Sequence, residues 1–185
     1  MIPGTVKRIT VGGDYNEAGK VVIPKGVKKI EKGALSSWTP VTVKVAKGNK
    51  RYAVSNGSVY SKVSGRLVLG YVKDGILKVP DKVRKIDCDI GKGYVGKVPK
   101  KAIIPKGVKE IRHLLSMTMI IPSKFTVIMK GKNPPKIVDY TLLNAKGLTI
   151  YVPKGCRKKY IEKWKKGYGE SWNLNGGPQF KIVEH

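Results

Sequence analysis

The stretch Ile23-Pro24-Lys25-Gly26-Val27-Lys28-Lys29-Ile30 returns along the chain with its apolar positions kept. Counted from the proline, an apolar residue stands directly before it, and a second stands three residues after it. A third apolar residue, isoleucine, stands six residues after it. Copies spaced by about 20 to 50 residues are typical of units that stack into a solenoid. This motif, the cassette, has its prolines at Pro3, Pro24, Pro80, Pro105, Pro122 and, in a copy that then diverges, Pro153.

Each part of the cassette has a local structural reason. The β-branched residues before Pro24 favour a strand, which the proline ends because it has no N–H to donate to a ladder. Pro24 and Gly26 match positions i+1 and i+3 of a type I turn. The offset of three between Val27 and Ile30 indicates a corner whose two side chains point inward. The residues expected to repeat this core are Pro24, Val27, Ile30, Pro80, Val83, Ile86, Pro105, Val108 and Ile111.

Two segments depart from the cassette. Residues 52–72 contain Asn56-Gly57, which favours a type I′ turn, and Ser64-Gly65, which predicts a second reversal, so we expect one or two β-hairpins there. Near the C-terminus, Tyr160, Ile161 and Trp164 stand at helical spacing among basic residues. We expect this amphipathic helix to cover the apolar end of the last coil, as a terminal cap does.

The cassette resembles the repeat of the BspA-like leucine-rich repeat family, in which a strand is followed by Leu/Ile-Pro-x-x-Val-x-x-Ile-x-x-x-Ala-Phe. The fullest copy runs over residues 22–35, with Leu35 in place of the usual phenylalanine. Residues 48–68 resemble an insert that such proteins carry, and residues 133–184 resemble their C-terminal unit. The Ala-Phe pair is missing after Ile86, Ile111 and Ile128, so we expect the later coils to be irregular.

The resemblance implies a mainly β fold, namely an irregular leucine-rich-repeat solenoid with a β-hairpin insert and a helix-containing C-terminal cap. Residues 1–152 would form the solenoid, with the insert at about 52–72, and residues 153–185 the capping unit, all within a single structural domain. The resemblance also implies a binding or adhesion module at an extracellular or cell-surface location. It names no ligand.

Charge is the strongest compositional signal. The 185 residues carry 38 basic and 12 acidic side chains, a formal net charge of +26. Only six of the basic residues are arginines, the type suited to bidentate contacts with phosphates and base edges. Lysine is a hydrated point charge, so the composition favours a diffuse anionic partner, or simple solubility, over sequence-specific nucleic-acid recognition.

Part of this charge falls at fixed cassette positions. Because stacked coils repeat every 4.7 to 4.9 Å or so, residues at one offset would form a ladder along one face. Two interpretations stay open: a solvated face that keeps the protein soluble, which we weigh first, and a Lys-rich face that binds a protein, an anionic surface or an anionic polymer. This predicted basic face consists of Lys7, Lys28, Arg84 and Lys109, four residues after a proline, and Arg8, Lys29 and Lys85, five residues after one.

The sequence offers no pattern for catalysis or for a cofactor. Its only histidines are His113 and His185, and its two cysteines, Cys88 and Cys156, lack metal-ligand spacing. The carboxylates that flank Cys88 would raise the pKa of its thiol and make it less nucleophilic. We therefore expect no enzyme, no metal and no cofactor. No apolar run approaches the roughly 18 residues that a membrane-spanning helix needs.

Three functions remain open from the sequence. The first is the binding or adhesion module. The second is a structural component of a larger assembly, such as a virion or a surface layer, because the chain opens inside a repeat whose edge a partner or further repeats would cover. The third is a non-specific binder of nucleic acid or another polyanion. The chain shows no signal peptide, which leaves open a fragment of a longer protein or a virion or intracellular component.

Overall fold

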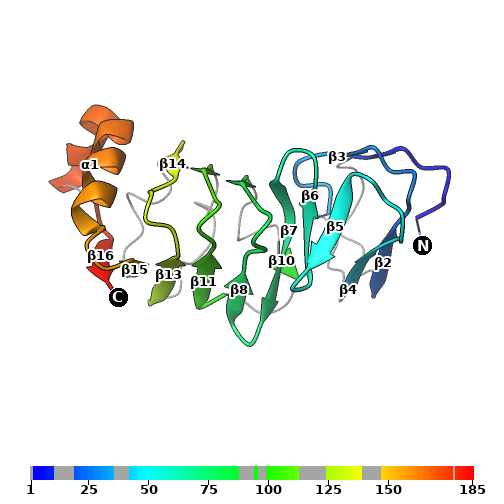
Figure 1. The fold of residues 1–185 in the computed structure, drawn as a ribbon, viewed down its shortest axis with the longest axis horizontal. Helices are drawn as coiled ribbons and strands as arrows, with labels where there is room; N and C mark the ends of the chain where they lie inside the picture. Colours follow the sequence, from blue (N-terminus) through cyan, green and yellow to red (C-terminus); the bar gives the residue numbers. More distant parts are fainter. Residues whose placement is uncertain are drawn as a thin grey trace.

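The structure, a computed structural model, describes residues 2–10, 19–35, 42–87, 94–95, 99–112, 124–138, 147–176 and 178–185. It is a mainly β solenoid with one α-helix in this part of the chain, and the coils follow one another along the long axis (Figure 1). Cys88 and His113 lie outside the described residues.

One side of the solenoid is a parallel ladder that includes the strands before Pro24, Pro80, Pro105 and Pro153. In the N-terminal part, β2 (Lys20–Ile23) pairs with β4 (Thr42–Val45). In the C-terminal part the parallel neighbours follow each other in chain order. They are β8 (Ile76–Lys78), β11 (Lys101–Ile104), β13 (Phe125–Met129), β15 (Leu148–Val152) and β16 (Lys181–Glu184).

A second set of two-residue strands follows the proline turns. Their isoleucines stand in register from coil to coil, as Ile86, Ile111 and Ile137 do, so each coil buries the same position. The strands are β1 (Arg8–Ile9), β3 (Lys29–Ile30), β9 (Lys85–Ile86), β12 (Glu110–Ile111) and β14 (Lys136–Ile137). In addition, β10 (Tyr94–Val95) pairs with β7 (Arg66–Lys73).

The cassette turn begins at the proline and not one residue before it. The backbone nitrogen of Val27 donates to the carbonyl oxygen of Pro24 at 3.3 Å, and the same bond recurs at Val83 with Pro80 and at Val108 with Pro105. Proline is therefore position i of the turn, which corrects the predicted i+1 placement. The preceding strand, whose last residue pairs in the ladder, fixes where the reversal starts.

The insert is a three-stranded antiparallel unit that interrupts the ladder between β4 and β8. Strand β5 (Tyr52–Ser55) pairs with β6 (Ser58–Ser61) through Asn56 and Gly57, whose φ values of 50° and 75° are those of the predicted type I′ turn. Strand β6 then pairs with β7, and β7 with β8. The turn between β7 and β8 also has positive φ, at Asp74 and Gly75, and the sequence analysis did not single it out.

The core consists of apolar side chains from all coils, in two neighbouring clusters. All nine predicted cassette residues are buried, and Val83, Ile86, Val27, Ile30 and Ile111 are at most 1% exposed. Burial of such side chains contributes about 1.5–3 kcal/mol each, which explains why the cassette keeps them.

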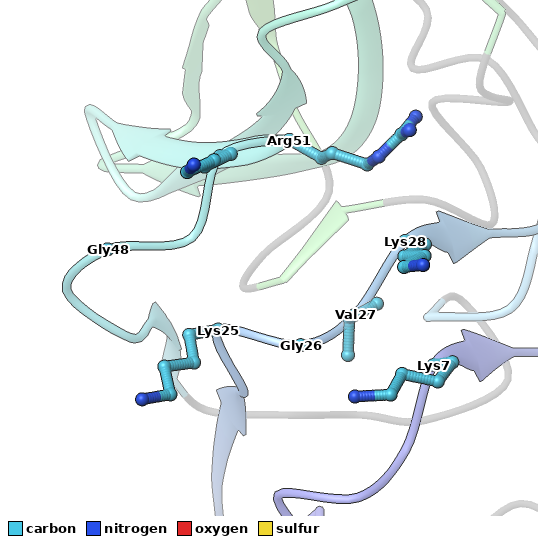
Figure 2. A pocket seen from close by; sticks show the side chains of 8 residues that line it. Lys7, Lys25, Gly26, Val27, Lys28, Gly48 and Arg51 are labelled. Atoms are coloured by element: carbon cyan, nitrogen blue, oxygen red, sulfur yellow. The ribbon is translucent and has the colours of Figure 1, made fainter.

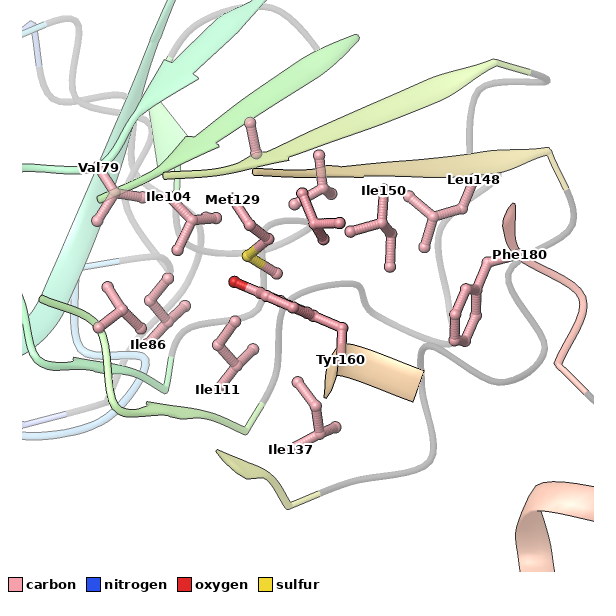
Figure 3. Packing of buried hydrophobic residues seen from close by; sticks show 14 of the residues in the cluster. Val79, Ile86, Ile104, Ile111, Met129, Ile137, Leu148, Ile150, Tyr160 and Phe180 are labelled. Atoms are coloured by element: carbon pink, nitrogen blue, oxygen red, sulfur yellow. The ribbon is translucent and has the colours of Figure 1, made fainter. Parts of the chain in front are cut away.

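Helix α1 (Arg157–Tyr168), the 3₁₀ helix η2 (Gly169–Gly176) and β16 end the chain. Tyr160 points among the core side chains (Figure 3), and its hydroxyl donates to the carbonyl oxygen of Gly131 at 2.6 Å. Burial raises the pKa of Tyr160. Trp164 donates from Nε1 to the carbonyl oxygen of Pro135 at 2.9 Å and packs edge-on against Tyr160. The predicted C-terminal helix is confirmed; Ile161 is only half-buried, and the buried Tyr168 was not predicted.

In the part of the chain that the structure describes, the helices are too short or too polar to cross a bilayer.

Candidate anion-binding pocket

The structure divides the predicted basic face into two parts. Lys28 lies directly on the coil of Lys7, since its backbone nitrogen donates to the carbonyl oxygen of Lys7 at 2.7 Å. Lys109 lies on the coil of Arg84 in the same way, at 2.8 Å. Between these pairs stands the insert, because the backbone nitrogen of Arg84 donates to the carbonyl oxygen of Gly65. The four residues therefore do not form one continuous row.

Arg84 is engaged within its own corner. Its Nη1 donates to the carbonyl oxygens of Asp81 at 2.8 Å and Val83 at 3.0 Å. The guanidinium also lies over Gly107, where an added Cβ would stand 2.2 Å from Nη1. These contacts make Arg84 a brace between coils more than a free cation.

The residues five positions after the prolines lie beside carboxylates. Arg8 hydrogen-bonds and pairs with Glu31, which Lys29 also approaches at 3.9 Å. The hydrogen bond from Arg8, with the charges of Arg8 and Lys29, lowers the pKa of Glu31. Lys85 stands in register with Glu110 and lies 3.9 Å from its carboxylate.

Two further pairs extend this compensation. Arg112 donates to Glu110 at 2.9 Å, and Lys32 lies 3.0 Å from Asp87. The hydrogen bond that Arg112 donates to Glu110, together with the negative charge of that carboxylate, raises the pKa of Arg112. This side of the solenoid thus carries both signs of charge, and exposed pairs of this kind contribute little to stability.

Lys7 and Lys28 instead line a pocket whose charge is all positive. The pocket encloses about 280 Å³, and Figure 2 shows Lys7 and Lys25 extending on either side of Gly26. Its lining residues are Lys7, Lys25, Gly26, Val27, Lys28, Gly48, Lys50 and Arg51. The five cationic side chains are exposed, and within the described residues none of them has an ion pair.

The pocket is held in shape by Asn49, which is only 4% exposed. Its Nδ2 donates to the carbonyl oxygen of Pro24 at 2.8 Å, and its Oδ1 accepts from the backbone nitrogens of Arg51 and Tyr52, each at 2.8 Å. The loop that carries Lys50 and Arg51 is therefore fixed against the proline turn that carries Lys25 and Lys28.

Two more contacts support this arrangement. The hydroxyl of the buried Tyr52 accepts a hydrogen bond from the backbone nitrogen of Ile30 at 2.7 Å, which ties the same loop to β3. Gly48 has φ of +85°, a conformation that glycine adopts without strain, where the loop turns at the pocket. The cations thus stand on a backbone that is already ordered.

Gly26 lets one of the cations lie close to the turn. A Cβ at this position would stand 3.0 Å from Nζ of Lys7 and 3.3 Å from the carbonyl oxygen of Gly4. Glycine therefore leaves the space that the Lys7 ammonium occupies over the proline turn. Valine at the next position, Val27, is 1% exposed and belongs to the core below.

The chemistry of the lining points to anion binding. Five like charges around one cavity repel one another, and a bound anion relieves that repulsion. The lining contains no aromatic ring on which a base could stack and no carboxylate, imidazole, thiol or hydroxyl for acid-base or nucleophilic chemistry. The pocket can hold and orient anionic groups through point charges.

The described residues contain no group of three or more His, Cys, Asp or Glu side chains that could hold a metal ion. Cys156 is buried at the start of α1, and His185 packs edge-on against Tyr151 with ring centroids 6.2 Å apart.

Sequence reasoning identified two of the pocket's five cations and missed Lys25, Lys50, Arg51 and the buried Asn49. The available signal was Gly48-Asn49 followed directly by two basic residues, at the end of a strand that lies one coil after the cassette of Pro24. Such a loop is placed beside the preceding proline turn by the parallel pairing of β2 and β4.

Comparison with known proteins gives two similar solved structures. One is a leucine-rich repeat protein from Eubacterium ventriosum, 22% identical, with a TM-score of 0.47; the similarity covers 73% of this chain and 42% of that one. The other is the pneumococcal vaccine antigen PcpA, 14% identical, with a TM-score of 0.33, covering 90% of this chain and 56% of that one. This chain thus spans less than two thirds of either protein. No protein-family model and no curated protein matches it.

Proposed function

We propose that this protein is a non-enzymatic binding module that holds an anionic polysaccharide in the pocket between the Pro24 turn and the loop of Asn49. The observation that carries the proposal is the separation of charge. Glu31, Asp87 and Glu110 neutralise the cations beside them, whereas Lys7, Lys25, Lys28, Lys50 and Arg51 surround one cavity without a carboxylate.

The side-chain types favour a polysaccharide over a nucleic acid. Single-stranded nucleic acids are held by aromatic platforms, and base edges are read by arginine forks. The pocket has no aromatic residue, and four of its five cations are lysines. Spaced sulfate or carboxylate groups on a sugar chain need only point charges, which lysine supplies.

We also propose that the chain belongs to the BspA-like type, because of its cassette and its C-terminal unit, and that it acts in adhesion at an extracellular or cell-surface location. An anionic glycan is a partner that such a setting offers. A leucine-rich repeat scaffold accommodates this role without catalysis.

Two variants of equal charge test the proposal. The first replaces Lys7, Lys25, Lys28 and Lys50 by Gln. The control replaces four exposed lysines on other strands or next to them, Lys44, Lys78, Lys124 and Lys181. Binding of a short sulfated oligosaccharide is measured by calorimetry at several salt concentrations.

The pocket variant is expected to lose at least tenfold in affinity at about 50 mM salt, together with most of the salt dependence, because fewer counterions are released. The affinity of the control variant should fall by no more than about threefold. Equal losses would show that net charge alone matters. Tighter binding of a DNA duplex than of the oligosaccharide would show that the polysaccharide class is wrong.

A further inference from the structure

A second cationic pocket lies at the other end of the solenoid, where helix α1 packs on the last coil (Figure 1). It encloses about 200 Å³, and its cations are Lys136 at the start of β14 and Lys163 and Lys166 on α1. All three side chains are exposed, and the lining includes no carboxylate.

This pocket also has a fixed frame. Trp164 is 1% exposed, and its bond from Nε1 to the carbonyl oxygen of Pro135 seats α1 on the backbone directly before Lys136. The acidic residue of the same helix, Glu162, lies 3.9 Å from Lys158 one turn earlier and does not line the pocket. The three lysines therefore line one pocket that has no carboxylate in its lining.

The two pockets are connected by the corner that follows the proline turns. Lys28 lines the first pocket at this corner, and Lys136 lines the second. On the side of the second pocket the coils lie directly on one another, since the backbone nitrogen of Lys136 donates to Lys109, and that of Lys109 to Arg84, each at 2.8 Å. Arg84 in turn donates to Gly65 of the insert, which lies between this basic row and Lys28.

The distance between the two pockets suits an anionic polymer and not a small anion. Strands β7, β9, β12 and β14 are successive neighbours, so β7 and β14 alone are about 14 Å apart at roughly 4.8 Å for each step. The first pocket lies beyond β7, at the Pro24 turn and the loop of residues 48–51. One sulfate or phosphate group cannot reach both pockets, whereas an extended polymer can.

We propose that one linear anionic polysaccharide spans both pockets along this corner, so that the module selects for chain length. This inference rests on the proposed function. Once one part of the chain is bound, the second contact is intramolecular, and two linked contacts of this kind can raise affinity by about 10²- to 10⁴-fold. A bilayer is a poorer match, because the apolar residues at the pockets, Val27, Ile137 and Trp164, are buried and unable to insert.

The test is a length series of sulfated oligosaccharides, from disaccharides upward, on three forms of the full chain. These are the native sequence, the pocket variant with Lys7, Lys25, Lys28 and Lys50 replaced by Gln, and a second variant with Lys136, Lys163 and Lys166 replaced by Gln. The native chain should show a step of at least tenfold in affinity at the length that reaches both pockets. The second variant should lack the step and keep the affinity for short chains.

Replacing Lys78, Lys124 and Lys181 by Gln gives the control for charge, and thermal melting verifies that each variant folds. A smooth rise of affinity with length in the native chain, or a step that survives in the second variant, would overturn the inference while leaving the proposed function intact. If neither pocket variant loses affinity for short chains, the proposed function itself is wrong. Equal binding of anionic lipid vesicles and long chains would make a membrane surface the better partner.

Discussion

The side-chain amide of Asn49 donates a hydrogen bond to the carbonyl oxygen of Pro24 at 2.8 Å across a separation of 25 residues. This bond joins the loop that carries Lys50 and Arg51 to the turn that carries Lys25 and Lys28. The position of four of the five pocket cations thus depends on one buried side chain.

Replacing Asn49 by Ala should lower the free energy of unfolding by about 1–3 kcal/mol, because the carbonyl of Pro24 and the backbone nitrogens of Arg51 and Tyr52 lose their partner in a buried place. Urea unfolding measures the change. Replacing the exposed Lys50 by Gln should alter stability by less than about 0.5 kcal/mol. Equal stability of the two variants would show that Asn49 does not hold the loop.

Replacing Gly26 by Ala should weaken anion binding while leaving stability nearly unchanged. The added Cβ displaces the flexible Lys7 ammonium from its place over the turn. Gly4→Ala is the matched control, since a Cβ at Gly4 meets nothing within 4 Å. Calorimetric titration with the oligosaccharide compares the two variants. The role of Gly26 would be refuted by equal affinities.

Helix α1 should be required for a soluble, stable solenoid. Trp164→Ala should cost about 3–5 kcal/mol of unfolding free energy, as large buried aromatic side chains do, whereas replacing the half-buried Ile161 should cost less. A chain that ends at Val152 should expose the core and associate. If that shortened chain stays monomeric with an unchanged melting temperature, the helix is an appendage.

Stability should fall in acid through Glu184. Its carboxylate accepts a hydrogen bond from the backbone nitrogen of Arg157 at 2.9 Å, at the start of α1, where Cys156 provides no side-chain cap. This bond, with further backbone donors at Gly155 and Cys156, lowers the pKa of Glu184 below its ordinary 4.5. A lowered pKa stabilises the fold above the ordinary value, and the contribution is lost as the pH falls through the folded-state value.

The measurement for this pH effect is thermal melting of the native chain and of the variant Glu184→Gln. At neutral pH the native chain should melt at the higher temperature, and the difference should disappear as the pH is lowered well below 4.5. A difference that persists at low pH would mean that the carboxylate charge is not its source.

The repeated core could be predicted from the sequence because it depends on local chemistry. Proline follows a strand in the copies at Pro24, Pro80 and Pro105, and the valine and isoleucine three and six residues later are buried in each of these coils. The copy at Pro122 was wrong, because Ile128 stands opposite Ile103 in the ladder and Ile137 takes the corner position of that coil. The Asn56-Gly57 turn was equally visible, since few other pairs adopt two positive φ values. The starting position of the proline turn was wrong by one residue, because the ladder pairing of the strand before it decides where the reversal begins.

The basic face shows where sequence offsets stop being informative. The offset that gives Lys85 also gives Glu110 in register beside it, and the insert separates Lys28 from Arg84. The pocket depends on a contact between Asn49 and a turn one coil earlier, and no repeat pattern contains it. Charge alone favoured an anionic partner, while the backbone bonds determine which lysines surround the pocket.

Mapping a bound oligosaccharide by nuclear magnetic resonance tests the pocket most directly. A short sulfated oligosaccharide is titrated into the labelled chain, and the shifts of backbone amides and lysine ammonium groups are followed. If the pocket is the binding site, the largest changes occur at Lys7, Gly26, Lys28, Gly48 and Arg51, and they saturate together. Changes of similar size at lysines all over the surface, or centred elsewhere, would show that the pocket is not the binding site.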